Sequence, residues 1–464
     1  MPRWLSALIG VVLLFVPQTL PLGDLSPAGA VALGLFAMAA WFWIMEPIPI
    51  YATSMAVILG QILLLSQNAP GVAYFDFPYE AGEAPSPNVF MGTLAHPILI
   101  LFLGGFMLAA AAVKYSVEKG LTRVLLGPFG SRPSMVLLGL MISTAVLSAF
   151  MSNTATTAMM ITVILPLLAL LGKEDRFRFA LALSIPLAAN LGGVATPIGT
   201  PPNAIALAAL APAGVEIPFS TWMLMAVPLV TVSLFIGWRL LLIWYPPEKE
   251  RLDLELNAKF PRSMPAVLFY FVGGATVLLW VTEQMHGLPS AVVAFLPVAL
   301  LPCLGILDKD DIRGLSWEVL WLVAGGISLG LSLRDTGLAE WIITQIDWSS
   351  LSGILLLLCF SAVTIAMANF LSNTVTASLI VPLTISIGTS GALGAGASMA
   401  ALTVGVAVSA SYGMSLPIST PPNAIAFSTG LLDTSKMIRV GIVMAVVGLV
   451  LATLAAQWYW PLFL

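Results

Sequence analysis

The sequence predicts an all-α polytopic membrane protein, with about 11 transmembrane helices and two re-entrant hairpins that form two inverted-topology repeats. Three observations predict it: an apolar composition, a pair of polar motifs that occurs twice at one spacing, and basic residues that gather on one side. Hydrophobic residues make up 59% of the 464 residues and charged residues only 9%, whereas about a quarter of a soluble protein is charged. The apolar runs are continuous and do not alternate with period two, which favours helices over a membrane barrel.

An apolar run of about 20 residues is long enough to span a bilayer as a helix. The first run, residues 5–20, follows Arg3 and resembles a secretory signal, but no small-residue cleavage site follows it. We therefore expect a retained first helix, with residues 1–28 as that helix and its lead-in. The expected spanning helices cover residues 4–22, 29–47, 50–66, 97–115, 179–211, 219–244, 265–283, 288–307, 315–333, 397–430 and 437–460.

Two further apolar stretches, residues 135–171 and 352–388, carry the polar triplet Ser-Asn-Thr at their middle. The triplets lie at Ser152–Thr154 and Ser372–Thr374, where a simple span has Leu or Val. Each stretch is long enough to enter and leave the bilayer on one side. Non-helical backbone is tolerated at that depth where it is buried in protein or lines a cavity. We expect two re-entrant hairpins.

The basic residues indicate the orientation, because Lys and Arg collect in cytoplasmic loops. With a cytoplasmic amino terminus, 16 of the 18 basic residues fall in inner loops, Arg239 lies at the inner end of its helix, and Arg334 alone falls outside. The carboxyl terminus then lies outside. The long 67–96 loop also lies outside, and it carries Asp76, Glu80 and Glu83 but no Lys or Arg.

A second motif, Thr-Pro-Pro-Asn, occurs at Thr200–Asn203 and Thr420–Asn423, and both motifs recur at the same offset of 220 residues. Two motifs held to one offset indicate an internal duplication. Each copy contains an odd number of crossings, so the second is expected upside down relative to the first, a plan common in secondary transporters. The copies cover residues 29–244 and 265–464, joined by a cytoplasmic linker at 245–264.

Proline explains why the second motif interrupts a helix. Proline lacks an N–H group and clashes with the preceding turn, so the 179–211 and 397–430 segments must break at Thr-Pro-Pro-Asn. A break exposes carbonyl oxygens, which ligate cations, and N–H groups, which bind anions. The Ser, Asn and Thr side chains of the hairpin tips add donors and acceptors. We expect a Na+ between each tip and its helix break, with an anion at the N–H end of the tip.

The absence of charge in these segments predicts coupling to a cation. Residues 145–170, 179–215 and 365–421 contain no Lys, Arg, Asp or Glu. A dianion would lose much hydration free energy on entering so neutral a pocket, and bound cations would supply the missing charge. Taken singly, a Ser or Thr in a membrane helix is more often structural. We expect Glu46 and Glu283, near the ends of spans, to be interface anchors or scaffold contacts and not ligands.

Other classes of function fit the sequence less well. Two histidines, two cysteines at Cys303 and Cys359, and no HExxH or GxSG motif argue against an intramembrane enzyme. No cluster of Lys and Arg indicates nucleic acid. A channel stays open as an alternative, and saturable accumulation driven by a gradient would separate a carrier from it.

The two Ser-Asn-Thr tips, the two Thr-Pro-Pro-Asn breaks, Glu46-Pro-Ile-Pro and the WVTEQMHGLP run at Trp280–Pro289 together resemble the divalent anion:Na+ symporter family. The resemblance covers nearly the whole chain and implies a homodimer that works by an elevator mechanism. It implies scaffold helices at 29–115 and 265–333. The transport domain would hold hairpins 135–171 and 352–388 with the broken helices 179–211 and 397–430, and helices 219–244 and 437–460 end the two repeats.

The resemblance also implies the site residues. The first Na+ site would use Ser148, Ser152, Asn153 and Gly199, and the second Ser372, Asn373 and Ser419. Ala368 stands where the first copy has Ser148, so the second site lacks one hydroxyl. The substrate carboxylates would meet Asn153, Thr154, Thr200, Pro201, Asn373, Thr374, Thr420 and Pro421.

The leading hypothesis for the substrate is a C4-dicarboxylate such as succinate, malate or fumarate, taken up with at least two Na+ across a bacterial cytoplasmic membrane. Two further hypotheses stay open: a Na+-coupled carrier of sulfate, citrate or another divalent anion, and a Na+-independent dicarboxylate exchanger. Competition by sulfate would point to the first of these, and counterflow without Na+ to the second.

Overall fold

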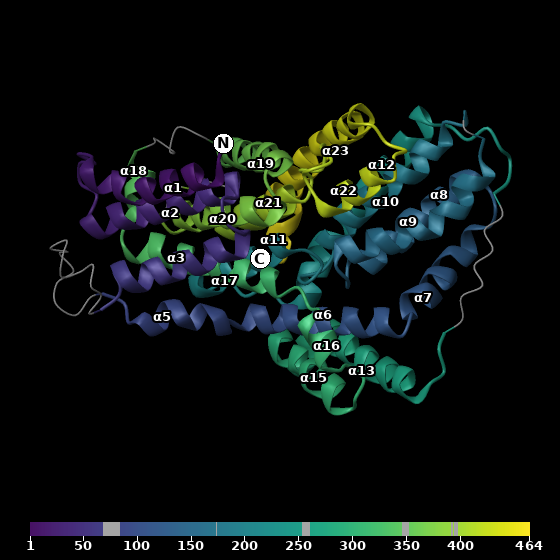
Figure 1. Cartoon of the computed structure of the whole chain (residues 1–464), viewed down its shortest axis with the longest axis horizontal. Helices are drawn as coiled ribbons and strands as arrows, with labels where there is room; N and C mark the ends of the chain where they lie inside the picture. The colour runs from purple at the N-terminus through teal and green to yellow at the C-terminus, as the bar shows by residue number, and fades with distance from the viewer. Residues whose placement is uncertain (68–83, 173, 253–259, 346–351, 391–392, 394–397) are drawn as a thin grey trace.

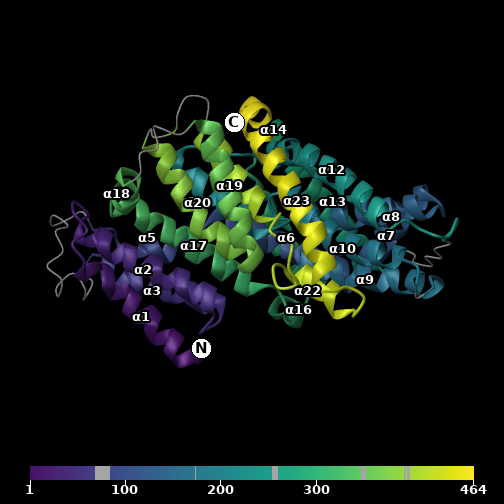
Figure 2. The same ribbon diagram turned by 90° about the horizontal axis from the view of Figure 1, so that it is seen from above.

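The computed structural model describes residues 1–67, 84–172, 174–252, 260–345, 352–390, 393 and 398–464. Every regular element in these ranges is a helix, so the predicted all-α fold is confirmed (Figure 1). The long helices lie roughly side by side, and the helices of the amino-terminal and carboxyl-terminal halves interleave (Figure 2).

The amino-terminal half contains the long helices expected from the apolar runs, together with shorter ones. Residues expected to form an inner loop after Lys114 form the amphipathic helix α7 instead. The helices are α1 Arg3–Thr19, α2 Pro27–Met45, α3 Ile50–Leu65, α5 Pro87–Gly92, α6 Pro97–Lys114, α7 Val117–Leu126, α8 Pro133–Ser148, α9 Asn153–Leu170, α10 Phe177–Val194, α11 Pro201–Leu210 and α12 Phe219–Trp244.

The carboxyl-terminal half repeats this order of long helices from α17 onward. Its helices are α13 Met264–Val281, α14 Glu283–His286, α15 Ser290–Cys303, α16 Lys309–Arg313, α17 Trp317–Asp335, α18 Leu338–Thr344, α19 Gly353–Phe370, α20 Asn373–Thr389, α21 Met399–Ala410, α22 Pro421–Ser428 and α23 Thr434–Leu454.

Three expectations fall partly or wholly outside the described residues. They are the acidic loop with Asp76, Glu80 and Glu83, residues 253–259 of the linker, and residue 397 at the start of the last broken segment.

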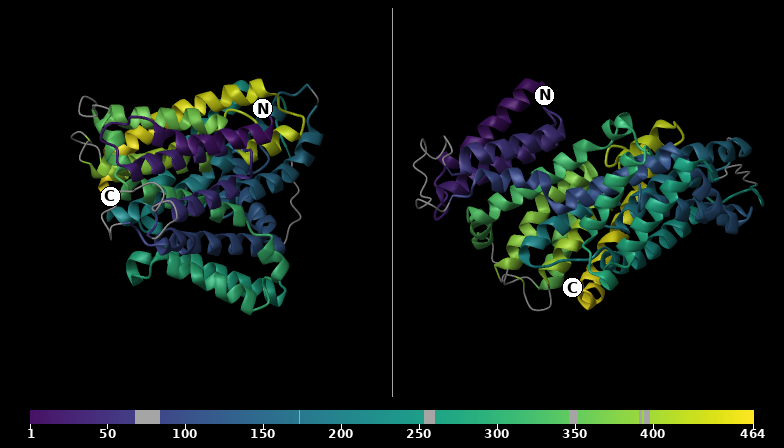
Figure 3. Two further views of the ribbon diagram at one scale, coloured as in Figure 1. Left: turned by 60° about the vertical axis from the view of Figure 1, so that its left-hand side comes forward. Right: turned by 90° about the horizontal axis from the view of Figure 1, so that it is seen from below.

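The surface of the protein suits a lipid environment. Eight helices in the described ranges are long and apolar enough to cross a membrane. Large apolar side chains stand exposed on them, among them Phe271 at 77%, Phe235 at 55% and Ile442 at 54%. A soluble domain rarely exposes contiguous apolar surface of this kind. Helices α13 and α15 form an outer layer along one edge of the molecule (Figure 3).

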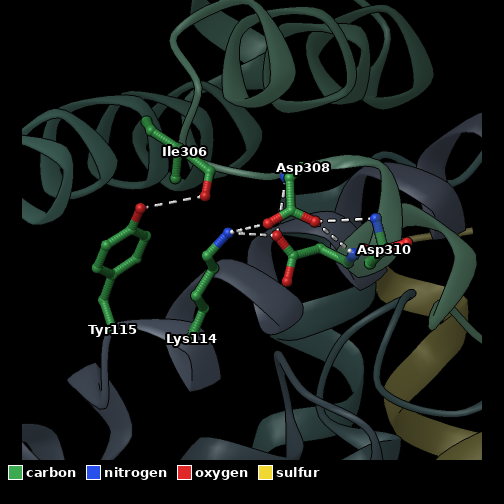
Figure 4. Close-up of polar contacts among 6 residues, drawn as sticks. Lys114, Tyr115, Ile306, Asp308 and Asp310 are labelled. Atoms are coloured by element: carbon green, nitrogen blue, oxygen red, sulfur yellow. Dashed lines mark hydrogen bonds and ion pairs between the residues drawn. The ribbon is translucent and has the colours of Figure 1, made fainter.

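An ion cluster joins α6 to the segment around α16. Lys114 Nζ, at the end of α6, lies 2.9 Å from Asp308 Oδ2 and also pairs with Asp311. Beside it, the hydroxyl of Tyr115 donates to the carbonyl oxygen of Ile306 at 3.1 Å (Figure 4). The Lys114 ammonium, hydrogen bonded to the Asp308 carboxylate, holds the pKa of that carboxyl at about 2. The cluster fixes two segments that are far apart in the sequence.

Glu283 makes the kind of scaffold contact that the sequence favours. Its carboxylate accepts hydrogen bonds from the N–H groups of Phe219 at 2.9 Å and Ser290 at 3.1 Å. These two residues begin α12 and α15. Because a helix amino terminus carries partial positive charge, one carboxylate stabilises both helix ends.

Candidate functional site

A cavity of about 300 Å³ lies where the two hairpin tips meet the two helix breaks. The α8 and α9 helices extend from it toward one side of the molecule, and the α19 and α20 helices toward the other (Figure 1). The expected residues that line the cavity are Ser152, Asn153, Thr154, Gly199, Thr200, Pro201, Ser372, Asn373, Thr374, Ser419, Thr420 and Pro421. Ser148 lies beneath the first tip and is fully buried.

Three helices outside the two motifs, α3, α6 and α17, also line the cavity. Ile50 of α3, Phe102 and Phe106 of α6, and Val319 of α17 supply apolar surface. Glu318, in the first turn of α17, also lines the cavity. The expectation of an uncharged pocket is therefore wrong, because that expectation considered only the motif segments.

The first hairpin tip turns a helix amino terminus toward the cavity. Ser152 is the N-cap of α9, and its hydroxyl accepts a hydrogen bond from the N–H of Ala155 at 3.4 Å. Asn153 and Thr154 occupy the first two helical positions, whose N–H groups have no partner within a helix. These groups and the helix dipole attract anions. The equivalent residues of the second tip are Ser372, Asn373, Thr374 and Val375 of α20.

The helix breaks have a different role from the tips. Pro201 and Pro202 occupy the first two positions of α11 and have no N–H to offer an anion. Asn203 closes the break, since its Nδ2 donates to the carbonyl oxygens of Gly193 at 3.0 Å and Thr196 at 2.8 Å. In the second copy, Asn423 Nδ2 donates in the same way to Met414 at 2.7 Å and Leu416 at 2.9 Å.

Three oxygens gather beneath the first tip with one hydroxyl hydrogen between them, and Ser148 and Ala189, which supply two of them, are buried. Ser148 Oγ lies 2.6 Å from Asn153 Oδ1 and 2.9 Å from the carbonyl oxygen of Ala189 in α10. A hydroxyl has one hydrogen, so it satisfies only one of these acceptors at a time. Hard cations take oxygen ligands, and this oxygen-rich cluster therefore suits Na+.

The second tip is built differently. Ala368 provides no hydroxyl, and Asn373 Oδ1 is buried without a protein partner among the described residues. Ser419 Oγ donates to the carbonyl oxygen of Asn369 at 2.8 Å, and Asn369 Oδ1 accepts from the N–H of Ser415 at 2.7 Å. The second tip therefore leaves an acceptor open where the first has a hydroxyl.

Asn190 connects the two halves and was not predicted. Its Nδ2 lies 3.2 Å from Thr420 Oγ1 and 3.3 Å from Asn423 Oδ1. The residue 220 positions later is Ala410, so the contact has no counterpart in the other copy. Accordingly, Asn203 Oδ1 is buried without a protein partner in the described part of the chain. The sequence signal that could have identified Asn190 is the difference between the two copies at this position, Asn190 in the first and Ala410 in the second.

Two glycine pairs bring the cavity walls together. A Cβ on Gly104 would meet Ala294 O of α15 at 2.6 Å, and one on Gly105 would meet Ile198 Cδ1 in the first break at 3.0 Å. The pair that recurs in α17 is Gly325, which faces Ser54 of α3, and Gly326, which faces Ser378 of α20. In each pair, the first glycine packs against a helix outside the two motifs, α15 or α3, and the second packs against a helix break or a hairpin helix.

The comparison with known families decides the identity. A family model described as "Sodium:sulfate symporter transmembrane region" matches residues 1–464. The chain belongs to the divalent anion:Na+ symporter family. The resemblance noted in the motifs is confirmed, and membership in this symporter family makes the chain a membrane transporter and not an enzyme.

Two relatives of this symporter match along most of their length. The sodium-dependent dicarboxylate transporter SdcS of Staphylococcus saprophyticus is 30% identical over 495 residues, which cover 97% of this chain and 89% of that protein. The protein of the same name from Staphylococcus aureus strain USA300 is 28% identical, with 98% and 89% covered.

A solved structure shows the same general fold. The Alcanivorax borkumensis YdaH transporter matches with a TM-score of 0.51 over 88% of this chain and 97% of that one. The two chains are 12% identical in sequence, so the likeness concerns the fold alone.

Proposed function

We propose that this symporter carries C4-dicarboxylates such as succinate, malate or fumarate together with Na+ across a bacterial cytoplasmic membrane. The observation that carries the proposal is the pair of helix amino termini, α9 and α20, that open onto one cavity of about 300 Å³. Two separate N–H ends match two carboxylates on one short carbon chain. Relatives named sodium-dependent dicarboxylate transporters support this choice.

The cation is part of this proposal because the polar groups alone leave a dianion short of positive charge. No Lys, Arg or His lines the cavity in the described part of the chain, and Glu318 adds a negative charge. We infer two Na+ sites. The first uses Ser148, Ser152, Asn153 and Gly199, and the second uses Ser372, Asn373 and Ser419. The oxygen cluster at Ser148 and the open acceptor at Asn373 support them.

The transport motion proposed is an elevator. The hairpins and broken helices would move as one body against scaffold helices at 29–115 and 265–333, in two inverted repeats. The glycines that face Ile198 and Ser378 support this, because they lie at the contact between the two proposed bodies, where small residues let backbones approach closely. A cytoplasmic amino terminus, an external carboxyl terminus and a homodimer complete the proposal. The distribution of basic residues supports the orientation, and light scattering on the detergent-purified protein tests the dimer.

Sulfate is the main competing substrate, since the family model carries its name. A single tetrahedral ion offers one anionic centre, whereas a dicarboxylate offers one carboxylate to each helix amino terminus. Citrate uptake and Na+-independent exchange of dicarboxylates compete with the proposal as well, and counterflow measured without Na+ would favour exchange.

Uptake of labelled succinate by proteoliposomes tests the function. An inward Na+ gradient should drive accumulation, and Asn153→Ala should abolish it because the variant loses one cation ligand and one tip contact. Uptake that is unchanged with choline in place of Na+ would refute the coupling. Inhibition by sulfate stronger than that by malate would favour sulfate as the substrate.

A further inference from the structure

We propose that Glu318 sets the charge selectivity of the cavity, so that a substrate with two carboxylates is accepted and one with a third ionised carboxylate is disfavoured. This inference rests on the proposed dicarboxylate function and concerns the part of the cavity lining that α17 contributes. Glu318 is the only ionisable side chain among the described residues that line the cavity.

The position of Glu318 brings its charge close to any bound anion. It lies in the first turn of α17, and Val319 and Leu322 of the same helix line the cavity beside it. Treated as a sphere, the cavity of about 300 Å³ is roughly 8 Å across, and this sets the scale of the separation between an anion at the hairpin tips and the lining at Glu318. At such a distance, repulsion between like charges is appreciable at the effective dielectric of a protein surface.

A purely structural role explains less. A first-turn carboxylate stabilises its own helix through the helix dipole, and Glu340 in the first turn of α18 has the same relation to its helix. Glu340 lines a different, smaller cavity with Arg334, whose lining contains no residue of the two motifs. Glu318 has no ion-pair partner in the described part of the chain, and it lines the same cavity as the two motifs.

The size of the expected change in substrate affinity depends on how far Glu318 is exposed to solvent. Glu318 is solvent exposed, so water and salt weaken its field. We expect each extra negative charge on the substrate to weaken binding by about threefold to tenfold. Two Na+ compensate a dicarboxylate, whereas a third carboxylate meets Glu318 without a further cation.

Two ligands that differ by one carboxylate test this directly. Glutarate and tricarballylate share a five-carbon chain, and tricarballylate carries one more carboxylate at its centre. Both are fully ionised at pH 8. Their dissociation constants are measured by calorimetry on the purified full-length protein in Na+ buffer, for wild type, Glu318→Gln, Glu318→Ser, Glu318→Asp and the matched control Glu340→Gln.

The ratio of the dissociation constants of tricarballylate and glutarate decides the outcome. In both neutral variants of Glu318, the preference for glutarate should fall by about threefold to tenfold, whereas Glu318→Asp and Glu340→Gln should keep it. Raising the ionic strength with choline chloride at fixed Na+ should reduce the preference in wild type and leave the neutral variants unchanged. An unchanged ratio in Glu318→Gln and Glu318→Ser, with glutarate binding intact, would overturn the role of Glu318. Wild type that binds no dicarboxylate would instead overturn the proposed function.

Discussion

At the scale of single residues, the difference between the two hairpin tips is the feature with the clearest consequence. Ser148 Oγ contacts both Asn153 Oδ1 and Ala189 O, whereas Ala368 leaves Asn373 Oδ1 without a partner in the described part of the chain. The two proposed cation sites therefore differ in their ligands. We expect them to differ in affinity for Na+ as well.

Removing the Ser148 hydroxyl should make the first site resemble the second. Ser148→Ala should raise the Na+ concentration for half-maximal uptake by about threefold to tenfold, because one ligand worth roughly 1 kcal/mol is lost. The matched control is Ser143→Ala on the same helix, whose buried hydroxyl has no partner among the described residues and lies outside the cavity. An equal shift in both variants would show that the effect is one of packing.

The motifs themselves could be predicted at this scale, and Glu318 could not. A duplicated Ser-Asn-Thr or Thr-Pro-Pro-Asn identifies itself by repetition, and the structure brings all four copies to one cavity. Glu318 has an ordinary setting in the sequence, at the start of an apolar helix, where a carboxylate usually reflects the helix dipole. Its place in the cavity depends on how α17 packs against the hairpins, which local sequence does not encode.

At the scale of elements, the asparagines that close the helix breaks make contacts within the breaks and do not line the cavity. Asn423 Nδ2 donates to two carbonyl oxygens and its Oδ1 accepts from Asn190, whereas Asn203 Nδ2 donates to three carbonyl oxygens and its Oδ1 has no partner in the described part of the chain. The proline positions predicted that a break occurs. The asparagine contacts across each break depend on the fold of the loop and were not predicted.

Truncating these two asparagines should lower the free energy of unfolding by different amounts. Asn423→Ala should cost about 2–4 kcal/mol and Asn203→Ala about 2 kcal/mol, because the first also leaves the buried amide of Asn190 without one acceptor. Thermal unfolding in detergent measures both, with Asn88→Ala on an exposed position as the control. A larger loss for Asn203→Ala would contradict the assignment of these contacts.

The ion cluster between α6 and α16 should make stability depend on acidity. The Lys114 ammonium lowers the pKa of Asp308 from 3.8 to about 2. A carboxyl whose pKa is lowered in the folded state adds stability above its unfolded pKa and loses it as the pH falls toward the folded value. The difference in unfolding temperature between wild type and Lys114→Met should therefore shrink between pH 6 and pH 3. A constant difference would show that Lys114 acts through packing alone.

At the scale of the whole molecule, the arrangement places four interrupted segments from two halves around one cavity. The spans, hairpins and breaks could be predicted because apolar runs, prolines and repetition each leave a strong local signal. The sequence predicts a loop where helix α7 lies, because the charged residues of this segment mask a short amphipathic pattern. Asn190 departs from the repeat, so symmetry gave no guide to its contact across the halves.

The proposed sliding motion can be stopped with a disulfide. A Cβ on Gly326 would lie 3.2 Å from the Cβ of Ser378, close to the 3.5–4.5 Å typical of a disulfide. In a background with Cys303→Ser and Cys359→Ser, oxidation of the pair Gly326→Cys and Ser378→Cys should reduce uptake to about a tenth, and a reductant should restore it. Ser378→Cys alone is the control, and full uptake by the cross-linked protein would refute relative motion at this contact.

The central claim is that Na+ forms part of the binding site of the anion. Calorimetric titration of the purified protein with succinate, in Na+ and in choline at equal ionic strength, tests it most directly. We predict that succinate binds at least about tenfold more tightly in Na+ and that succinate raises the affinity for Na+ by the same factor, as linkage requires. Equal affinity for succinate in Na+ and in choline would contradict the account.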